Sequence, residues 1–207
     1  ATLAFGLFWA RGVLFVSRFF AGVRWQVTGL ENLPEGPFIL ASKHQSFFDT
    51  VVWSQLIPNA AYVMKEELLS QPIFGWFIRH IDVVALDRKA GLSSLKKLLV
   101  DSQAKADQGL PVVIFPEGTR TRPGERGRYH PGVAAMYEKL NLPVVPVGTD
   151  SGVFWDQGLK GLKQGVITVA IQPAIQPGLD KRAFLTEVSE CIETSSLSLF
   201  EQAQIAG

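Results

Sequence analysis

Short apolar runs alternate with helical stretches from residue 37 to the end of the chain, and this alternation constrains the fold more than any other feature. Continuous apolar, β-branched strands that alternate with helices are typical of a mostly parallel sheet with helices on both faces. Because the sequence has no internal repeat, low-complexity tract or linker, residues 25–207 are predicted to form one α/β domain. The expected strands are 37–42, 61–65, 81–86, 110–115, 143–149 and 166–171, and the expected helices are 47–57, 66–79, 91–107, 131–140 and 181–203.

The carboxyl ends of the strands are where functional groups collect in such sheets. His44 follows the first expected strand, Lys65 ends the second, and Arg88 follows the third. An arginine-rich loop, residues 115–132, follows the fourth. If these strands are parallel, all four groups converge on one edge of the sheet, and we expect the functional site there.

The N-terminal segment, residues 1–24, is strongly apolar and contains no acidic residue. A membrane-spanning helix needs about 20 predominantly apolar residues, and Arg11 and Arg18 interrupt this segment. Seven residues apart, the two arginines fall on one stripe of a helix, with large apolar side chains over the rest. We therefore expect a helix that lies in the membrane interface with its arginines toward lipid phosphates. A buried core helix is the alternative.

The stretch SKHQSFFDTV, residues 42–51, contains a candidate proton-transfer pair. Ser46 and Asp49 fit the start of a helix, with His44 in the loop before it. Across this corner Asp49 can hold one imidazole nitrogen of His44, which leaves the other nitrogen to take a proton from a substrate hydroxyl. A loop histidine beside a capping aspartate, without catalytic function, is the alternative.

The loop FPEGTRTRPGERGRYHPG suits a phosphate group. Gly118 permits close backbone approach, and Arg120 offers a planar fork that matches phosphate oxygens. Lys65 and Arg88 at neighbouring strand ends can add positive charge. The sequence lacks the glycine-rich patterns of nucleotide-binding loops, which argues against a nucleotide. A solvated basic loop remains the alternative.

The motif H-x4-D at His44–Asp49, followed by FPEGTR at 115–120, resembles the glycerolipid acyltransferase family. The likeness extends over residues 25–180 and is greatest to bacterial 1-acyl-glycerol-3-phosphate acyltransferases, which make phosphatidic acid. Two small departures are Lys43, where the family commonly has Asn, and Thr121, where it usually has Ser. The resemblance implies acyl transfer from acyl-CoA or acyl carrier protein to the hydroxyl of lysophosphatidic acid. It also implies a membrane-associated enzyme on the cytoplasmic face of a bacterial inner membrane.

The resemblance further implies a role for each motif residue. His44 is the expected general base, and Asp49 fixes its tautomer. Arg120, Lys65 and Arg88 are expected to hold the acceptor phosphate. Glu117 is expected to orient Arg120 or the glycerol hydroxyl, while Gly118 and Thr119 shape the loop. No metal or organic cofactor and no nucleic-acid partner are expected.

Three other interpretations stay open. A serine hydrolase would use Ser46 as its nucleophile, although no G-x-S-x-G motif is present. A non-catalytic protein could bind anionic lipid or nucleic acid through residues 120–130, although Tyr129 is the one aromatic residue there and the His44–Asp49 pair would be left unexplained. A relative within the family could acylate glycerol 3-phosphate or another lysolipid. The single cysteine, Cys191, excludes an internal disulfide and fits a reducing compartment.

Overall fold

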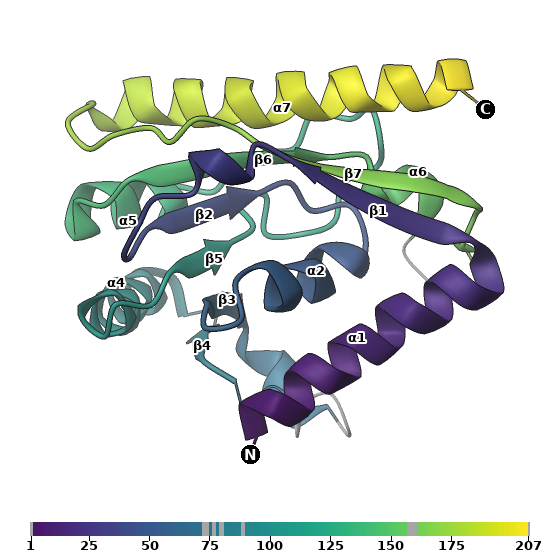
Figure 1. Ribbon diagram of the computed structural model, residues 1–207. Coiled ribbons are helices and arrows are strands. Elements are labelled where there is room, and N and C mark those ends of the chain that lie inside the picture. The colour runs from purple at the N-terminus through teal and green to yellow at the C-terminus, as the bar shows by residue number, and fades with distance from the viewer. Residues whose placement is uncertain are drawn as a thin grey trace.

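The structure, a computed structural model, describes residues 2–71, 75, 78, 81–87, 90–156 and 161–206. These residues form a seven-stranded sheet with the order β1-β7-β6-β2-β5-β3-β4 (Figure 1). All strands from β6 to β4 run parallel, whereas β7 runs antiparallel to β6 and β1 runs parallel to β7. The mostly parallel α/β sheet predicted from the sequence is therefore confirmed. The strands are β1 (Val23–Thr28), β2 (Ile39–Ser42), β3 (Ala61–Lys65), β4 (Val83–Leu86), β5 (Val112–Ile114), β6 (Val144–Thr149) and β7 (Gly165–Ile171).

Strand β1 was not expected from the sequence. Its residues alternate between more buried and more exposed positions, as suits an edge strand, so it lacks the continuous apolar run of the central strands. Residues Val23 to Thr28 pair with Gly165 to Ala170 of β7. The expected boundary between residues 24 and 25 therefore falls inside a strand of the domain.

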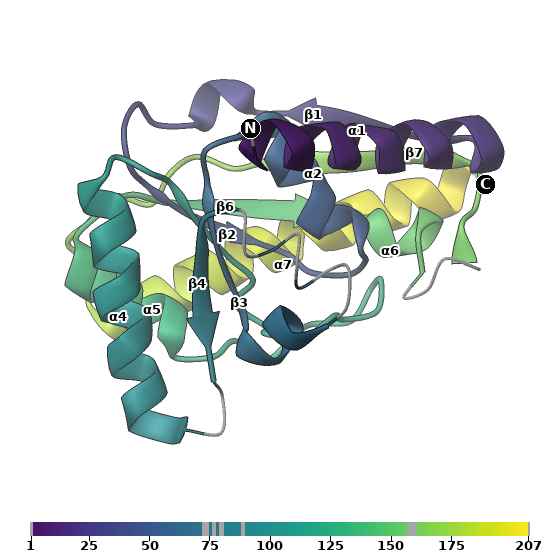
Figure 2. The same ribbon diagram turned by 90° about the horizontal axis from the view of Figure 1, so that it is seen from below.

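Helices cover both faces of the sheet, as the alternating pattern predicts. On one face, α1 (Thr2–Ala21) and α2 (Phe48–Leu56) contribute to an apolar core with Leu40, Val113 and Val145. On the other face, α4 (Gly91–Asp107), α5 (Gly132–Leu140) and α7 (Lys181–Ala206) enclose a second core. Figure 2 shows α1 and α2 in front of the sheet and α7 behind it. Adjacent β2 residues serve opposite cores, because the side chains of a strand alternate.

Short helices complete the described chain. These are the 3₁₀ helices η1 (Leu30–Asn32) and η2 (Glu66–Ser70) and the α-helix α6 (Ser151–Phe154). The helix expected at 66–79 begins as η2, and most of its remaining residues lie outside the described part of the chain.

Helix α1 packs against the domain along one side and leaves an apolar side exposed. Ala10 and Leu14 are buried in the core beneath it, whereas Phe8, Phe15 and Phe19 are 73%, 66% and 72% exposed. Within the described residues, Ala4–Ala21 is the one helical segment long and apolar enough to cross a membrane, judged by length and composition alone, and 22% of it is buried. Arg11 donates a hydrogen bond to Gln55 on α2 at 3.0 Å, so this arginine also attaches α1 to its neighbour.

Candidate active site

The carboxyl ends of β2, β3 and β5 meet at one cavity, as the parallel sheet requires. The cavity has a volume of about 880 Å³, and its wall includes His44, Lys65, Gly118, Thr119 and Arg120. Three of the four groups expected at this edge are thus brought together. The fourth, Arg88, lies outside the described residues.

His44 and Asp49 form the pair expected from their spacing. Nδ1 of His44 lies 3.2 Å from Oδ2 of Asp49, and the Asp49 side chain is 2% exposed. The same Oδ2 accepts the backbone N–H groups of Gln45 at 2.6 Å and Ser46 at 2.8 Å. Because this oxygen serves as an acceptor throughout, Nδ1 of His44 is the donor. The tautomer that follows has an unprotonated Nε2, which is the form a general base requires.

The imidazole is also fixed by packing and by its own backbone. The ring of Phe115 stacks on it with a centroid distance of 4.2 Å and an interplanar angle of 25°. The backbone N–H of His44 donates to Oε2 of Glu117 at 2.9 Å, and its carbonyl accepts the N–H of Thr121 at 2.8 Å. The loop after β5 therefore binds both backbone groups of His44, its N–H through Glu117 and its carbonyl through Thr121.

Glu117, which the family resemblance implies orients Arg120 or the glycerol hydroxyl, is buried beside the cavity. Its side chain is 1% exposed and is not part of the cavity wall. Oε1 lies 2.7 Å from Nζ of Lys43 and accepts the hydroxyl of Thr121 at 3.1 Å. Burial raises the pKa of Glu117, and the adjacent Lys43 ammonium opposes that rise. The contacts of its carboxylate are thus to Lys43, Thr121 and the backbone N–H of His44, and its expected role toward Arg120 or the glycerol hydroxyl stays a prediction.

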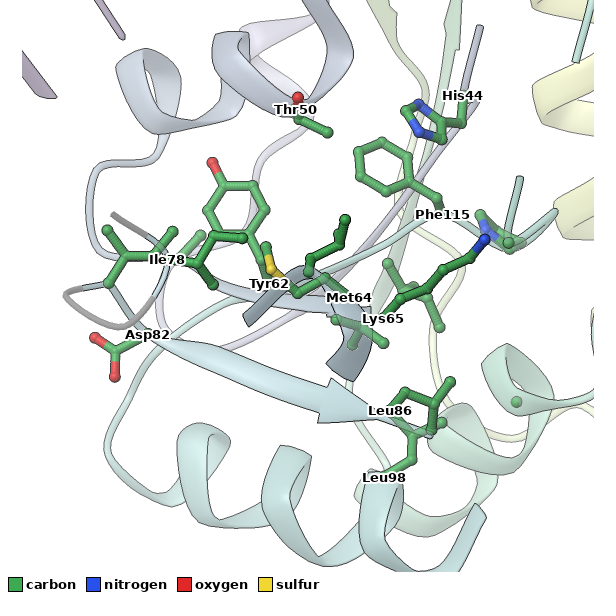
Figure 3. A pocket seen from close by; sticks show the side chains of 18 of the residues that line it. His44, Thr50, Tyr62, Met64, Lys65, Ile78, Asp82, Leu86, Leu98 and Phe115 are labelled. Atoms are coloured by element: carbon green, nitrogen blue, oxygen red, sulfur yellow. The ribbon is translucent and has the colours of Figure 1, made fainter. Parts of the chain in front are cut away.

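The basic side of the cavity is formed by two chain segments. Lys65, at the end of β3, extends toward the same end of the cavity as His44 and Phe115 (Figure 3). Gly118 has a φ of 65°, a left-handed conformation that favours glycine, and it turns the loop so that Thr119 and Arg120 reach the cavity. Arg120 presents a guanidinium group suited to bidentate binding of an oxyanion.

Away from this basic end the cavity is mainly apolar and extends to both faces of the sheet. Figure 3 shows Tyr62 and Ile78 on the side of β4 that faces α2, and Leu86 and Leu98 on the side that faces α4. The wall on the first side also includes residues of α1. Such a space suits long hydrocarbon chains, because apolar surface is removed from water on both partners.

Ser46 is placed as a helix-start residue. It is fully buried, is not in the cavity wall, and accepts the N–H of Phe48 through Oγ at 3.2 Å. A nucleophile must reach the substrate, so this position argues against the hydrolase interpretation. The helix-start interpretation of Ser46 and Asp49 agrees with these contacts.

Sequence reasoning missed several residues around the site. No role in the site was predicted for Phe115, beyond the end of a strand and the start of the basic loop, or for His130, yet both line the cavity. Glu193 of α7, which contacts Lys43, belongs to no motif and gives no signal in the sequence. Within the described residues, no three His, Cys, Asp or Glu side chains are grouped so that they could hold a metal ion. The expectation that no cofactor takes part stays a prediction.

Comparison with known proteins identifies the family. The family model described as Acyltransferase matches residues 24–150, which include both motifs and most of the sheet. The chain belongs to the acyltransferase family.

Three of its relatives carry the name of the same enzyme activity. The 1-acyl-sn-glycerol-3-phosphate acyltransferase of Pseudomonas aeruginosa is 36% identical over 167 residues, which are 81% of this chain and 65% of the relative. A chloroplastic enzyme of the same name from Brassica napus is 31% identical, over 72% of this chain and 44% of its own length. The human beta form is 26% identical, over 76% and 58%. The chain thus spans less than two thirds of the length of each of these three relatives.

A solved structure supports the fold. The 1-acyl-sn-glycerophosphate acyltransferase PlsC of Thermotoga maritima matches 95% of this chain and 79% of its own chain, with a TM-score of 0.78 and 23% sequence identity. At that identity the likeness bears on the fold alone. It agrees with the single α/β domain preceded by an apolar helix.

Proposed function

We propose that this acyltransferase moves an acyl group from a thioester to the free hydroxyl of 1-acyl-glycerol-3-phosphate, which gives phosphatidic acid. The observation that carries the proposal is the meeting of three features in one cavity. They are the oriented base His44, the cations of Arg120 and Lys65, and an apolar space of the size of lipid chains. A lysophosphatidic acid molecule has the matching parts: a hydroxyl, a phosphate and a hydrocarbon chain.

In the proposed reaction, Nε2 of His44 removes the proton of the acceptor hydroxyl as the oxygen attacks the thioester carbonyl. The imidazolium that forms is stabilised by Asp49, whose carboxylate contacts Nδ1. Collapse of the tetrahedral intermediate breaks the carbon–sulfur bond, and the thiolate takes the proton back from His44. The acyl group passes directly to the acceptor, so no acyl-enzyme forms.

Arg120 and Lys65 are proposed to bind the acceptor phosphate, with Arg88, two positions after the last residue of β4 in the sequence, as a further candidate. A guanidinium fork and a flexible ammonium are both common phosphate ligands. Gly118 and Thr119 present the loop to the phosphate. Glu117 holds the loop to the His44 segment, because its buried carboxylate accepts the backbone N–H of His44.

We propose membrane attachment through the exposed apolar side of α1. A lipid acceptor resides in a membrane, and the cavity wall includes Gly6, Leu7 and Trp9 of the same helix. Exposed phenylalanines beside this wall would place the cavity entrance at the lipid surface. The cytoplasmic face and a donor of acyl-CoA or acyl carrier protein belong to the same proposal.

The test supplies labelled acyl-CoA and acyl carrier protein with a panel of acceptors, and identifies the lipid product by mass spectrometry. The panel contains lysophosphatidic acid, glycerol 3-phosphate, lysophosphatidylcholine and lysophosphatidylethanolamine. We expect phosphatidic acid from the first acceptor, and loss of that product in His44→Ala. Preferred acylation of glycerol 3-phosphate or a zwitterionic lysolipid would overturn the acceptor assignment. Release of free fatty acid without transfer would favour a hydrolase.

A further inference from the structure

Lys43 lies at the centre of a buried cluster of charges beneath the active site. It is 1% exposed, and its Nζ contacts Oε1 of Glu117 at 2.7 Å and both carboxylate oxygens of Glu193 at 2.8 Å. A fourth contact, at 3.1 Å, is to the backbone carbonyl of Glu125. One ammonium group thus lies between two carboxylates, in a place where an unpaired charge would be costly.

Glu193 joins two segments that carry active-site residues. It projects from α7 and is 6% exposed. Besides Lys43, its Oε1 accepts the N–H of Gly127 at 3.2 Å and the hydroxyl of Tyr129 at 3.1 Å. Lys43 directly precedes His44, and Gly127 and Tyr129 belong to the loop that carries Arg120. A single carboxylate, distant in sequence from both motifs, therefore contacts the base segment and the phosphate loop together.

Lys43 also acts on His44 through Glu117. The Glu117 carboxylate uses Oε1 for Lys43 and Thr121, and Oε2 for the backbone N–H of His44. The loop packs closely here, since a Cβ atom at Gly127 would lie 2.4 Å from Oε1 of Glu117. A chain of direct contacts thus runs from α7 through Lys43 and Glu117 to the histidine backbone.

Stability alone gives a weak reason for such a cluster. Buried ion pairs often contribute no more to folding than apolar side chains of the same volume, because desolvation offsets the attraction. What a charged cluster provides is fixed geometry: each carboxylate oxygen has assigned donors, and a shifted loop would leave charges unpaired. This geometry links the two groups that the reaction needs, a base and a phosphate ligand.

We infer that Lys43 and Glu193 are positioning residues that set His44 and Arg120 relative to one another, so that α7 takes part in the active site from behind the sheet. The inference rests on the proposed acyl transfer. Neither residue contacts substrate. Lys43 keeps Glu117 as an acceptor for the His44 N–H, and Glu193 holds the phosphate loop against the base segment.

Glu193→Leu tests the loop contact. The remaining Lys43–Glu117 pair is neutral as a whole, so we expect the protein to fold. Gly127 N–H and Tyr129 O–H lose their acceptor, and the apparent KM for lysophosphatidic acid should rise about tenfold, the worth of about one good hydrogen bond. The KM for the thioester and kcat should change much less. Glu193→Gln keeps an acceptor oxygen and should restore most of the acceptor affinity.

Lys43→Met tests the contact to His44 and should act on kcat. Without the ammonium, the charged and titratable groups around the Glu117 carboxylate are Glu193 and Tyr129, with the positive charge of Arg126 acting on Tyr129. Glu117 still accepts the backbone N–H of His44. Burial already raises the pKa of Glu117, and loss of Lys43 removes the opposing charge. Glu117 should therefore take up a proton at higher pH, and the acid limb of the kcat profile should move upward. Lys43→Met with Glu193→Leu removes one carboxylate and should reverse part of that shift.

The control is Lys181→Ala, which breaks an exposed pair between α7 and α5, Lys181 to Glu138 at 3.0 Å. It should leave kcat, both KM values and the pH profile unchanged. Wild-type kinetics and pH profile in folded Glu193→Leu and Lys43→Met would overturn the inference, because the cluster would then be structural only. Hydrogen exchange gives a readout that is independent of activity. We expect faster exchange at His44 and Gly127 in the two variants, and unchanged exchange would also contradict the inference.

Discussion

Oδ2 of Asp49 lies 3.2 Å from Nδ1 of His44 while it accepts two backbone N–H groups, those of Gln45 and Ser46, from the segment just before α2. One oxygen therefore orients His44, the proposed base, and holds the loop that carries it. The two contributions can be separated, because the backbone bonds need an acceptor oxygen whereas the imidazolium also needs a negative charge.

Asp49→Asn is expected to fold but to lose most of its turnover. The amide oxygen can occupy the Oδ2 position and keep the backbone hydrogen bonds, but a neutral amide stabilises the imidazolium far less. We expect kcat to fall by a factor on the order of 10²–10⁴, the usual worth of a positioned base. Steady-state kinetics with saturating lysophosphatidic acid would measure it. Asp101→Asn, on the outer side of α4, is the matched control. A kcat close to that of the wild type and of Asp101→Asn would count against the His44 assignment.

Ser46→Ala is expected to keep most of the activity. The hydroxyl is buried, accepts the Phe48 N–H and is absent from the cavity wall. Loss of this helix-start bond should lower the free energy of unfolding by about 0.5–2 kcal/mol, measurable by urea denaturation. Mass spectrometry of the wild type during turnover provides the opposite test. An acyl group found on Ser46 would mean that transfer passes through the serine.

Much of the fold could be predicted from the sequence because central parallel strands are apolar along their whole length. All six expected strands are present, and α4 has the expected bounds, Gly91–Asp107. Strand β1 escaped prediction because an edge strand such as VRWQVT can carry polar side chains on its exposed face. Edge position depends on the finished sheet, and no local pattern encodes it.

The candidate site was also predictable only in part. His44, Asp49, Lys65 and the loop that bears Arg120 could be placed from spacing and from the rule for strand ends, and the structure brings them together. The buried position of Glu117 could not be foreseen, since its partner Lys43 is paired in turn with Glu193 on the last helix. A contact between residues so far apart in sequence depends on how α7 crosses the sheet. The catalytic and binding roles of His44, Asp49, Lys65 and Arg120 remain predictions.

Arg120→Ala is expected to weaken binding of the acceptor but not of the thioester. Because the phosphate belongs to lysophosphatidic acid, its apparent KM should rise at least tenfold, while the KM for the thioester changes little. Arg120→Lys should also be impaired, since an ammonium group cannot reproduce the planar fork. Initial rates over a grid of both substrates would separate the two constants. A change confined to the thioester KM would move Arg120 to the donor side of the cavity.

The exposed apolar side of α1 should determine binding to membranes. Deleting the helix would also remove Ala10 and Leu14 from the core, so substitutions at the surface make a cleaner test. We expect Phe8→Ser, Phe15→Ser and Phe19→Ser together to reduce sedimentation with vesicles of phosphatidylglycerol and phosphatidylethanolamine. Activity on acceptor embedded in vesicles should fall more than activity on acceptor in detergent.

Ile205→Ser is the control for that experiment. This residue is 88% exposed on α7, on the opposite face of the sheet from α1. Its loss should not affect sedimentation. Equal vesicle binding by the triple variant and the wild type would rule out α1 as the attachment surface.

Asp150 should make the folded protein less stable as the pH rises from about 4 to about 6. Its side chain lies at the end of β6, is 3% exposed, and accepts the Thr168 N–H through Oδ1 at 2.7 Å. Burial raises the pKa of this carboxyl from 3.8 to about 6, and the negative charge of Asp49 adds to the rise. The native state thus binds the proton more tightly than the unfolded chain, so the favourable contribution is complete below pH 4 and lost as the pH passes 6.

Asp150→Asn removes this titration but keeps an oxygen for the Thr168 N–H. We expect the variant and the wild type to have similar free energies of unfolding near pH 4. At pH 7 the variant should be more stable by an amount on the order of 3 kcal/mol, from about two pKa units at 1.36 kcal/mol each. Urea denaturation at several pH values would measure the difference. Asp107→Asn, exposed at the end of α4, should not alter the pH dependence. Parallel curves for Asp150→Asn and the wild type would mean that Asp150 is ionised in the native state throughout this range, with its charge compensated where it lies.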